Sequence, residues 1–372
     1  MRRLTHALLA LLIGSCASAP SDSESAAATP TGAVQATPPT PRPYLATSDD
    51  RRARLASVMH WFYYLDFDPH EAPLQRIAES AYDLIVLEPL FTEREQAEFP
   101  IADLVAKLHA APHSKLVIAY LNVGQAEAWR SYWQPSWRVG HPVWIVGEDP
   151  DGWEGNYPVA YWHEEWKKIW LSPMGILPAI LAAGFDGVYL DWVEAYSDEN
   201  VLAAARRDGV IARAEMIRWV GELASFARAR QPDFLVITQN AAELIEDQGY
   251  LAVIDAVAQE HTWFDGGPDN HPPGDCPLPR AEADVESNAY VESLSPVCRR
   301  VYERFPESTL HVSSEWYLRY LTMARAQGAI VLTVDYAQDV ANVAWVVATS
   351  RALGFVPLVS ERGLSVYLDP AP

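Results

Sequence analysis

Two acidic residues each follow a short apolar run in this sequence. Asp191 comes directly after Val188-Tyr189-Leu190, and Glu260 follows Ala256-Val257-Ala258-Gln259. In a parallel sheet the strand interior is packed, while the carboxyl end opens into a ligand crevice. Two carboxylates facing a shared pocket are the minimum equipment for glycoside hydrolysis. Asp191 and Glu260 are therefore the candidate catalytic residues, with helix capping or an arginine pair as the alternative role for Asp191.

The residues around the two carboxylates suggest different tasks. We expect the apolar run before Glu260 to raise the pKa of its carboxyl group, which suits a general acid and base. Asp191 is then expected to stay ionised and to act as the nucleophile. A carboxyl separation of ~5–5.5 Å implies retention of the anomeric configuration, and ~6.5–9.5 Å implies inversion. We expect retention.

Polar residues also end the other apolar runs. They are Asp66, Glu88, Asn122 with Gln125 and Glu127, Gln239 with Asn240, and Asp335 with Tyr336. If these runs are parallel strands, their ends meet at one mouth and form a polar pocket. An ion pair with Arg130 or another arginine is the alternative role for Asp66 and Glu127. Capping of the following helix or turn is the alternative for Asn240 and for Asp335.

Aromatic residues gather near the same runs. Eleven lie between residues 125 and 170, namely Trp129, Tyr132, Trp133, Trp137, Trp144, Trp153, Tyr157, Tyr161, Trp162, Trp166 and Trp170. Trp192 and Tyr196 follow Asp191, and Trp263 and Phe264 follow Glu260. Flat rings beside carboxylates and amides suit sugar rings, which have an apolar face and a rim of hydroxyl groups. Packing within the segment itself is the alternative role.

The spacing of the apolar runs predicts the fold that positions these side chains. Strands are expected at residues 61–65, 84–87, 116–121, 187–190, 234–238, 256–259, 329–334 and 355–359, with helical patterns at 101–110, 176–183, 212–229 and 316–326. Eight apolar strands alternating with helices are typical of a (β/α)8 TIM barrel in the α/β class. An open doubly wound sheet is the alternative, but no Gly-rich dinucleotide loop supports it. Long loops are expected after strands three and six, at about 125–170 and 262–307.

The first fifty residues predict export. Arg2 and Arg3 precede a short apolar run that ends Leu12-Ile13-Gly14-Ser15-Cys16 and resembles a bacterial lipobox. We expect a signal peptide at 1–16 with Cys16 lipidated, a disordered Pro/Ala/Ser/Thr-rich tether at 17–50, and the barrel at 51–372. The product would be a lipoprotein of the cell envelope, held to the membrane by its lipid. Ordinary secretion, with cleavage near residues 17–19, is the alternative.

The net charge and the cysteine content limit which ligands and covalent links the chain is expected to have. A formal net charge of −21 argues against nucleic acid, whose phosphates require Lys and Arg. Cys276 and Cys298 lie in one Pro/Gly-rich segment, and in an exported protein they most simply form a disulfide. That region offers too few ligands for a metal site, and no cofactor is expected.

Four segments in order resemble glycoside hydrolase family 114, the endo-α-1,4-polygalactosaminidase-like barrels. They are Tyr120-Leu121-Asn122-Val123-Gly124-Gln125-Ala126-Glu127, Gly155-Asn156-Tyr157-Pro158-Val159-Ala160-Tyr161-Trp162, the stretch from Gly184 to Tyr196, and Thr238-Gln239-Asn240. The resemblance implies a (β/α)8 barrel without metal that cleaves an α-1,4-linked galactosamine-rich polymer. Its two carboxylates map onto Asp191 and Glu260.

The sequence departs from the family pattern at several positions. Asn122 and Gln125 stand where the family tends to have Ser and Glu, Glu194 where it often has Asp, and Ala241 where Gly is usual. A cationic polymer would suit the acidic chain. The candidate substrate-binding residues are Asp66, Glu127, Asn156, Tyr157, Tyr161, Trp192, Asn240, Asp335 and Tyr336.

The leading hypothesis is an exported, retaining glycoside hydrolase that acts on an amino-sugar polysaccharide. One alternative is a surface-anchored barrel that binds carbohydrate without cleaving it. Another is a glycosidase or transglycosylase for a different glycan. Release of reducing ends from the polymer separates the first alternative from the enzyme.

Overall fold

The computed structural model describes residues 47–66, 73–150, 152–266, 275–306 and 308–370. The predicted signal peptide, its Cys16 and the tether up to residue 46 lie outside the described residues. The predicted end of the tether at residue 50 is wrong, because helix α1 (Ser48–Leu55) already includes residues 48–50. The helix begins there because Thr47 and Asp50 form a capping box, in which each side chain accepts a hydrogen bond from the other residue's backbone N–H.

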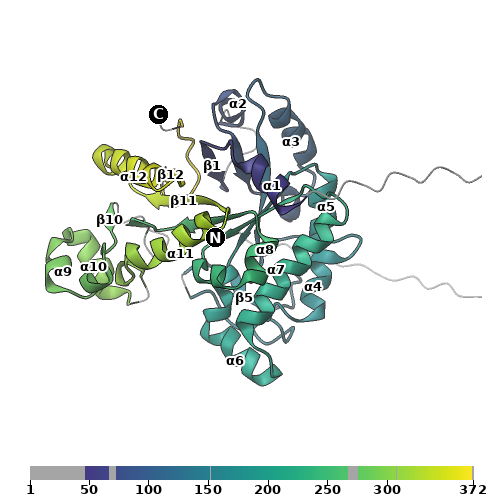
Figure 1. The fold of residues 1–372 in the computed structure, drawn as a ribbon. Helices are drawn as coiled ribbons and strands as arrows, with labels where there is room; N and C mark the ends of the chain where they lie inside the picture. Colours follow the sequence, from purple (N-terminus) through teal and green to yellow (C-terminus); the bar gives the residue numbers. More distant parts are fainter. Residues whose placement is uncertain (1–46, 67–72, 151, 267–274, 307, 371–372) are drawn as a thin grey trace, which may run out of the picture. The chain divides into compact units, whose positions relative to one another are not determined.

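All eight predicted strands are present, in one sheet (Figure 1). They are β1 (Trp61–Tyr64), β2 (Leu84–Leu87), β3 (Leu116–Asn122), β6 (Gly187–Asp191), β7 (Leu235–Gln239), β8 (Ala256–Glu260), β11 (Ile330–Tyr336) and β12 (Val356–Ser360). Each strand pairs in parallel with the next in this order. Their residues are almost all buried, as expected for a sheet that is covered on both faces.

The sheet curls back on itself, so that β12 lies beside β1. At this seam the indole Nε1 of Trp61 donates to the carbonyl of Val356 at 2.9 Å, and the backbone N–H of Leu65 donates to the carbonyl of Leu364 at 3.1 Å. The fold is therefore the predicted (β/α)8 barrel.

Aromatic side chains fill the interior of the barrel. Tyr63 lies against Tyr189 with ring centroids 4.9 Å apart, and Trp61 and Tyr120 pack around this pair at about 6 Å. All four side chains are buried. The barrel is thus a packed core, into which three of these side chains also bring phenol hydroxyl groups.

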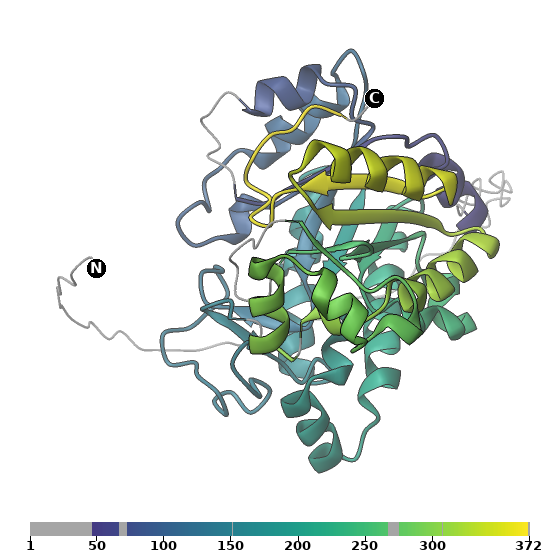
Figure 2. The same cartoon turned by 90° about the vertical axis from the view of Figure 1, so that its left-hand side faces the viewer.

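Helices surround the strands, as the two cartoon views show (Figures 1 and 2). They are α2 (Pro73–Glu79), α3 (Ile101–His109), α4 (Glu164–Leu171), α5 (Ile176–Ala182), α6 (Glu199–Asp208), α7 (Ala212–Arg228), α8 (Gln248–Val253), α9 (Asn288–Ser293), α10 (Pro296–Arg304), α11 (Ser314–Ala326) and α12 (Val340–Ala352). The four predicted helices are α3, α5, α7 and α11. In α3 the buried residues Ile101, Leu104, Val105 and Leu108 follow the spacing of one helical face.

Both predicted long loops are present and carry structure of their own. The loop after β3 contains the antiparallel pair β4 (Gln125–Glu127) and β5 (Asn156–Pro158), followed by α4. The loop after β8 contains β9 (Phe264–Asp265), β10 (Cys276–Pro277), α9 and α10. In Figure 1 this second loop lies beside α11, away from α4, α6 and α7.

The second loop holds the predicted disulfide. Cys276 and Cys298 are bonded, and both are buried in a small core with Tyr290, Leu294 and Leu310. A short segment with few apolar residues gains order from such a covalent link.

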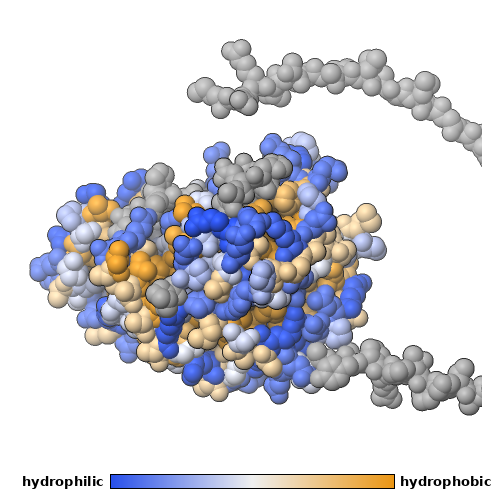
Figure 3. Space-filling model, turned by 90° about the horizontal axis from the view of Figure 1, so that it is seen from above, coloured by the Kyte–Doolittle hydropathy of each residue, from blue (hydrophilic) through white to orange (hydrophobic). Residues whose placement is uncertain are grey.

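Hydrophilic residues dominate the face drawn in Figure 3, and hydrophobic residues appear there in scattered groups. Apart from the gaps named above, no helix between residues 47 and 370 has the length and apolar composition that a bilayer crossing requires.

Candidate active site

A cavity of about 590 Å³ lies at the carboxyl ends of the strands. Carboxylic acids dominate the charged residues of its wall, and they are Asp66, Glu88, Glu93, Asp191, Glu194, Glu260 and Asp265. Arg362 and His261 are the basic residues that line it. The aromatic wall consists of Tyr63, Trp129, Trp153 and Trp192. A deep pocket with this lining favours a ligand that combines apolar faces with many hydrogen-bond donors.

The same backbone turn follows three neighbouring strands. The residue after the last one of β6, β7 and β8 has a left-handed conformation, with φ of 57° at Trp192, 58° at Asn240 and 53° at His261. Such values are uncommon outside glycine and cluster at functional sites. Gly124 permits one of these turns, because a Cβ atom there would lie 2.2 Å from the carbonyl oxygen of Trp192.

Asp191 ends β6 and lies at the cavity wall. Its Oδ2 accepts a hydrogen bond from the Tyr120 hydroxyl at 2.6 Å, and its Oδ1 accepts one from the backbone N–H of Trp192 at 2.8 Å. Burial and the nearby Glu260 raise the pKa of Asp191 to about 7, and these two hydrogen bonds oppose the shift only in part. Asp191 therefore carries a proton at mildly acidic pH.

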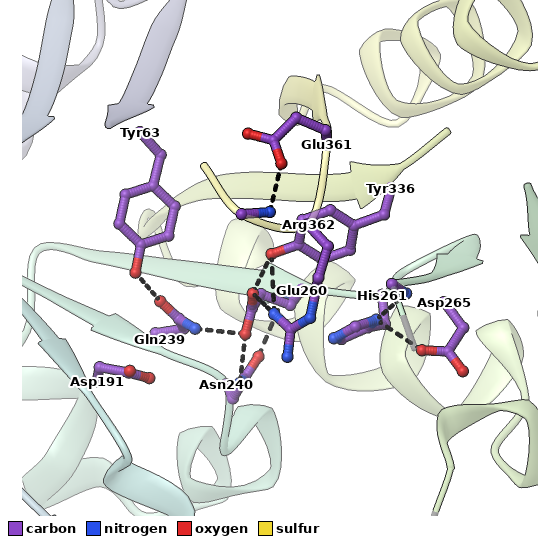
Figure 4. A network of polar contacts seen from close by, with 12 residues as sticks. Tyr63, Asp191, Gln239, Asn240, Glu260, His261, Asp265, Tyr336, Glu361 and Arg362 are labelled. Carbon is purple, nitrogen blue, oxygen red and sulfur yellow. Dashed lines mark hydrogen bonds and ion pairs between the residues drawn. The ribbon is translucent and has the colours of Figure 1, made fainter. Parts of the chain in front are cut away.

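Glu260 ends β8 and receives donors on both carboxylate oxygens (Figure 4). Tyr336 OH donates to Oε1, and Arg362 Nη1 lies 3.4 Å from the same atom. Gln239 Nε2 donates to Oε2, as does Asn240 Nδ2 at 3.2 Å. Burial disfavours the ionised form, but Arg362, His261 and these hydrogen bonds outweigh it and lower the pKa of Glu260.

These pKa directions correct the sequence-based expectation for the two carboxylates. The apolar run before Glu260 does not raise its pKa, because the side chain points among donors that other strands supply. Asp191 was expected to stay ionised, yet its pKa is the one that rises. The pKa values of these two carboxyl groups in the same cavity are thus shifted in opposite directions.

Arg362 is a functional residue that sequence reasoning missed. It lies just after β12, and its guanidinium carbon is 5.2 Å from the ring centroid of Tyr336 and 5.4 Å from that of Trp153. Gly266 leaves the space for this arrangement, since a Cβ atom there would meet the Arg362 side chain at 2.5 Å and the Tyr336 ring at 2.6 Å. No local pattern marked Arg362, which reaches Glu260 across 102 residues of sequence.

Tyrosine hydroxyl groups connect the barrel core to the cavity. Tyr63 donates to Gln239 Oε1 at 3.0 Å, and Gln239 in turn donates to Glu260 (Figure 4). Tyr120 donates directly to Asp191. Burial raises the pKa of both phenols well above the usual value, so they remain hydrogen-bond donors at neutral pH.

Glu127 does not line the cavity, which corrects its assignment as a substrate-binding residue. Its Oε2 accepts from Arg130 Nε at 2.6 Å, and Arg130 also binds Glu88 and, at 2.8 Å, the Thr92 hydroxyl. The alternative role of Glu127, a structural ion pair with Arg130, is the one present. Glu88 does line the cavity, and burial raises its pKa to about 7 although Arg130 opposes the shift.

The other predicted substrate-binding residues divide into two groups. The cavity is lined by Asp66, Asn156, Trp192 and Asn240. Asn240 does more than cap the following turn, because its side-chain amide forms hydrogen bonds with both Glu260 and Glu194. The remaining assignments, Tyr157, Tyr161, Asp335 and Tyr336, do not line it.

Each of these four residues has a structural contact instead. Tyr157 stacks on Trp133 at 4.9 Å, and Tyr161 is buried with its hydroxyl bonded to the carbonyl of Ala212. Asp335 is buried and caps the backbone N–H groups of Trp263 and Phe264. Tyr336 acts through its bond to Glu260. The family-like segment 155–162 therefore builds the wall mainly through Asn156.

Most aromatic residues of the first long loop pack against one another. Trp137, Trp144, Trp166 and Trp170 form a continuous series of ring contacts that extends to Trp219 on α7. Trp129 and Trp153 line the cavity. Packing, the alternative role for these aromatics, thus accounts for most of them.

The disulfide-linked loop contributes the opposite wall. Ser308 donates to Asp265 Oδ2 at 2.7 Å, and both residues line the cavity together with Thr309. Asp265 pairs with Cys276 between β9 and β10, which joins this wall to the disulfide. Among the described residues, no group of three or more His, Cys, Asp or Glu side chains is arranged to hold a metal ion.

Comparisons with known proteins agree with this geometry. The sequence profile of the glycoside-hydrolase family GH114 matches residues 79–369. An uncharacterized protein of Deinococcus radiodurans is 34% identical over 365 residues, which cover 98% of this chain and 99% of the relative. Relatedness to this protein therefore extends over nearly the whole chain.

Two solved structures have a similar fold. The glycoside hydrolase domain of PelA from Pseudomonas aeruginosa has a TM-score of 0.52 at 17% identity and covers 85% of this chain and 98% of its own. Aspergillus fumigatus Ega3, solved in complex with galactosamine, has a TM-score of 0.53 at 14% identity and covers 89% of this chain and 99% of its own. With its barrel, its pair of strand-end carboxylates and a family match over most of its length, this chain belongs to glycoside-hydrolase family GH114 and is a glycoside hydrolase.

Proposed function

We propose that the enzyme cleaves an α-1,4-linked galactosamine-containing polysaccharide, with Asp191 and Glu260 as its catalytic pair. The observation that carries this proposal is the pair of carboxyl groups at the ends of β6 and β8 that line one cavity, each accepting a hydrogen bond from a tyrosine hydroxyl. The excess of carboxylates in the wall favours a cationic sugar such as deacetylated galactosamine. The galactosamine bound in Ega3 supports the same class of substrate.

The surroundings of the two groups suggest their roles. A general acid must hold a proton near neutral pH, and Asp191 does so. The lowered pKa of Glu260 favours the ionised form that a nucleophile needs. Glu260 would attack the anomeric carbon while Asp191 protonates the departing glycosidic oxygen. Asp191, then ionised, would take a proton from the water that releases the sugar from Glu260.

Two displacements of this kind retain the anomeric configuration. A direct attack by water would need Glu260 as a general base, a role for which a lowered pKa is poorly suited. Proton NMR of the first product formed distinguishes the two outcomes. Appearance of the α-anomer before mutarotation supports the proposal, and initial appearance of the β-anomer contradicts it.

The catalytic pair is tested with Asp191→Asn and Glu260→Gln assayed on a galactosamine polymer. Each variant should release reducing ends about 10²–10⁴-fold more slowly than the wild type. Tyr161→Phe is the matched control, since Tyr161 lies outside the cavity, and it should keep wild-type turnover. Wild-type rates in either carboxylate variant would remove that residue from the mechanism.

We also propose that the enzyme is exported and anchored through lipid on Cys16. The lipobox-like segment and the disulfide support this location, because disulfides persist in oxidising compartments. Metabolic labelling with palmitate should mark the wild type and leave Cys16→Ser unlabelled. Release of an unlabelled wild-type enzyme into the medium would instead indicate ordinary secretion.

A further inference from the structure

Trp129 lines the catalytic cavity but has no part in the reaction described above. Among the tryptophans of the chain, all of which the structure describes, it alone is exposed, with 39% of its surface accessible. Trp133 and Trp137, in the same loop, contact each other's rings, whereas the Trp129 ring stacks on no aromatic ring of a described residue. An exposed flat ring inside a ligand cavity indicates a binding surface.

The segment that carries Trp129 is fixed by the neighbouring loops. The carbonyl oxygen of Trp129 accepts a hydrogen bond from the backbone N–H of Arg94 at 3.0 Å, and the backbone N–H of Ala128 donates to the carbonyl of Gly155 at 2.8 Å. The next residue, Arg130, is buried in the ion-pair cluster described above. The backbone that bears the ring is therefore ordered before a ligand arrives, which lowers the entropic cost of binding.

Gly155 allows the loop backbone to approach the Trp129 ring. Its φ is +95°, and a Cβ atom at this position would lie 3.2 Å from Cζ3 of the indole. A larger residue would be strained by this backbone conformation and would crowd the ring. The indole thus lies against the glycine and keeps the rest of its surface open.

Trp129 lies across the barrel mouth from Glu260. In the closed strand order β1-β2-β3-β6-β7-β8-β11-β12, β2 is four strands away from β8 in either direction. Trp129 follows β3 and bonds the segment after β2, while Asp191 at the end of β6 comes between it and Glu260 in this order. With Glu260 at the anomeric carbon and Asp191 at the departing oxygen, the released sugar extends toward Trp129.

Two carboxylates line the cavity on the same side as Trp129. Glu93 follows β2, and its backbone pairs with that of Arg130, next to Trp129. Asp66 follows β1, the neighbour of β2. Within the described ranges, neither carboxylate accepts a hydrogen bond from another residue, so both are open to a ligand. A flat ring beside such acceptors fits a sugar, whose apolar face stacks and whose hydroxyl groups donate.

We propose that Trp129, Glu93 and Asp66 form a subsite that binds the sugar on the leaving-group side of the cleaved bond. This inference rests on the proposed cleavage of a galactosamine polymer by Asp191 and Glu260. Stacking on Trp129 holds the departing sugar while Asp191 protonates its oxygen. Removal of the ring should therefore slow cleavage between two sugars and spare a substrate with a very small leaving group.

The test compares kcat/KM on two substrates that share the same glycosyl unit. An α-1,4-linked galactosamine oligomer places a sugar in the subsite, whereas α-galactosaminyl fluoride releases fluoride and leaves the subsite empty. Trp129→Ala should lower kcat/KM about tenfold on the oligomer and by less than about twofold on the fluoride. Trp129→Phe keeps a flat ring and should retain most of the activity on the oligomer.

Trp162→Ala is the matched control, because Trp162 is a half-buried tryptophan of the same loop that does not line the cavity. It should leave the ratio of kcat/KM for the two substrates within about twofold of the wild type. A loss on the fluoride that equals or exceeds the loss on the oligomer in Trp129→Ala would indicate a structural role and overturn the inference.

The outcomes also separate this inference from the proposed function. If the wild type does not cleave the oligomer, the proposed function fails and this inference fails with it. If the wild type cleaves the oligomer and Trp129→Ala does so at the same rate, the inference on Trp129 alone fails.

Discussion

The β6 side and the β8 side of the cavity are built alike, yet the pKa values of their carboxyl groups are shifted in opposite directions. Asp191 and Glu260 each end a parallel strand, and each is followed by a residue with a left-handed backbone. Glu260 is buried and Asp191 is half-buried, and a tyrosine hydroxyl donates to each of them. The pKa of Asp191 nevertheless rises to about 7, while that of Glu260 falls.

The difference lies in what the rest of the chain brings to each side. Glu260 receives a guanidinium from Arg362 and amide donors from Gln239 and Asn240. On the β6 side, a hydroxyl and one backbone N–H are the donors to Asp191, and the charge of Glu260 acts against ionisation. Loss of water contact makes both groups sensitive to their neighbours, and Arg362, His261 and the hydrogen-bond donors together lower the pKa of Glu260.

Chemical rescue tests this comparison with the largest expected effect. Asp191→Ala and Glu260→Ala should each lose about 10²–10⁴-fold in turnover of the polymer. With an aryl glycoside and azide, Glu260→Ala should form a glycosyl azide of the configuration opposite to the substrate, because azide replaces the nucleophile. Asp191→Ala should form the azide of the same configuration, because azide attacks the glycosyl-enzyme. NMR of the azides assigns the anomers.

The wild type treated with azide is the control for this rescue, and it should form mainly the hydrolysis product. Exchange of the two azide configurations between the variants would reverse the roles of Asp191 and Glu260 while leaving the pair in place.

Substitution of Arg362 should make the β8 side resemble the β6 side. With the roles proposed above, activity should fall at low pH when Glu260 becomes protonated and above about pH 7 when Asp191 ionises. Arg362→Met removes the cation, so the pKa of Glu260 rises and the acidic limb of the kcat/KM profile moves upward by about one pH unit. Activity below that limb should drop on the order of tenfold.

Arg362→Lys retains a positive charge and is the matched control, with a smaller shift expected because a lysine lacks the planar contact with Trp153 and Tyr336. The alkaline limb should stay near pH 7 in both variants. An acidic limb that does not move in Arg362→Met would show that Glu260 owes its ionised state to other groups.

Thermal stability should respond in opposite directions on the two sides, with the smallest effects of the three. The raised pKa of Asp191 means that the unfolded chain loses its proton above about pH 4 while the folded chain keeps it until about pH 7. Folding stability therefore decreases over that range, and Asp191→Asn should relieve the loss. Its Tm should exceed that of the wild type by a few degrees at pH 8 and by less at pH 4.

Glu260→Gln should lower the Tm at pH 8. The lowered pKa of Glu260 means that its ionised form stabilises the folded state above the pKa of the unfolded chain, and this contribution is lost as the pH falls through the folded pKa. The NH2 group of the introduced amide would also face the donor groups of Tyr336, Gln239 and Arg362, from which it cannot accept hydrogen bonds. Shifts of the same sign for both variants at pH 8, measured by calorimetry, would contradict the comparison.

Much of the fold could be predicted because its signals are local. Each barrel strand is a short apolar run bounded by turn residues, and each observed strand lies within two residues of its predicted bounds. The end of the tether was predicted wrongly because Ser48, Asp49 and Asp50 look like linker residues. Thr47 and Asp50 turn them into the first turn of α1 by capping it.

The site was predicted only in part. Apolar runs in the sequence indicate where strands end, but they do not indicate in which direction a side chain points. Asp191, Glu260 and Asn240 follow apolar runs, and all three line the cavity. Tyr161 belongs to an equally distinctive segment, yet its ring turns inward and its hydroxyl bonds the carbonyl of Ala212. Glu194 was visible as a departure from the family pattern, but its unpartnered oxygen is a property of the packed structure.

The sequence by itself determined the barrel, the two carboxylates at its mouth, the cysteine pair and the family. These follow from residue type and periodic spacing along short stretches, which the chain carries wherever it folds. Only the tertiary structure decided that the pKa of Glu260 is lowered and that the pKa of Asp191 is raised. Arg362 lies 102 residues from Glu260, and the interaction between buried charges depends on their distance in space and on the water excluded between them.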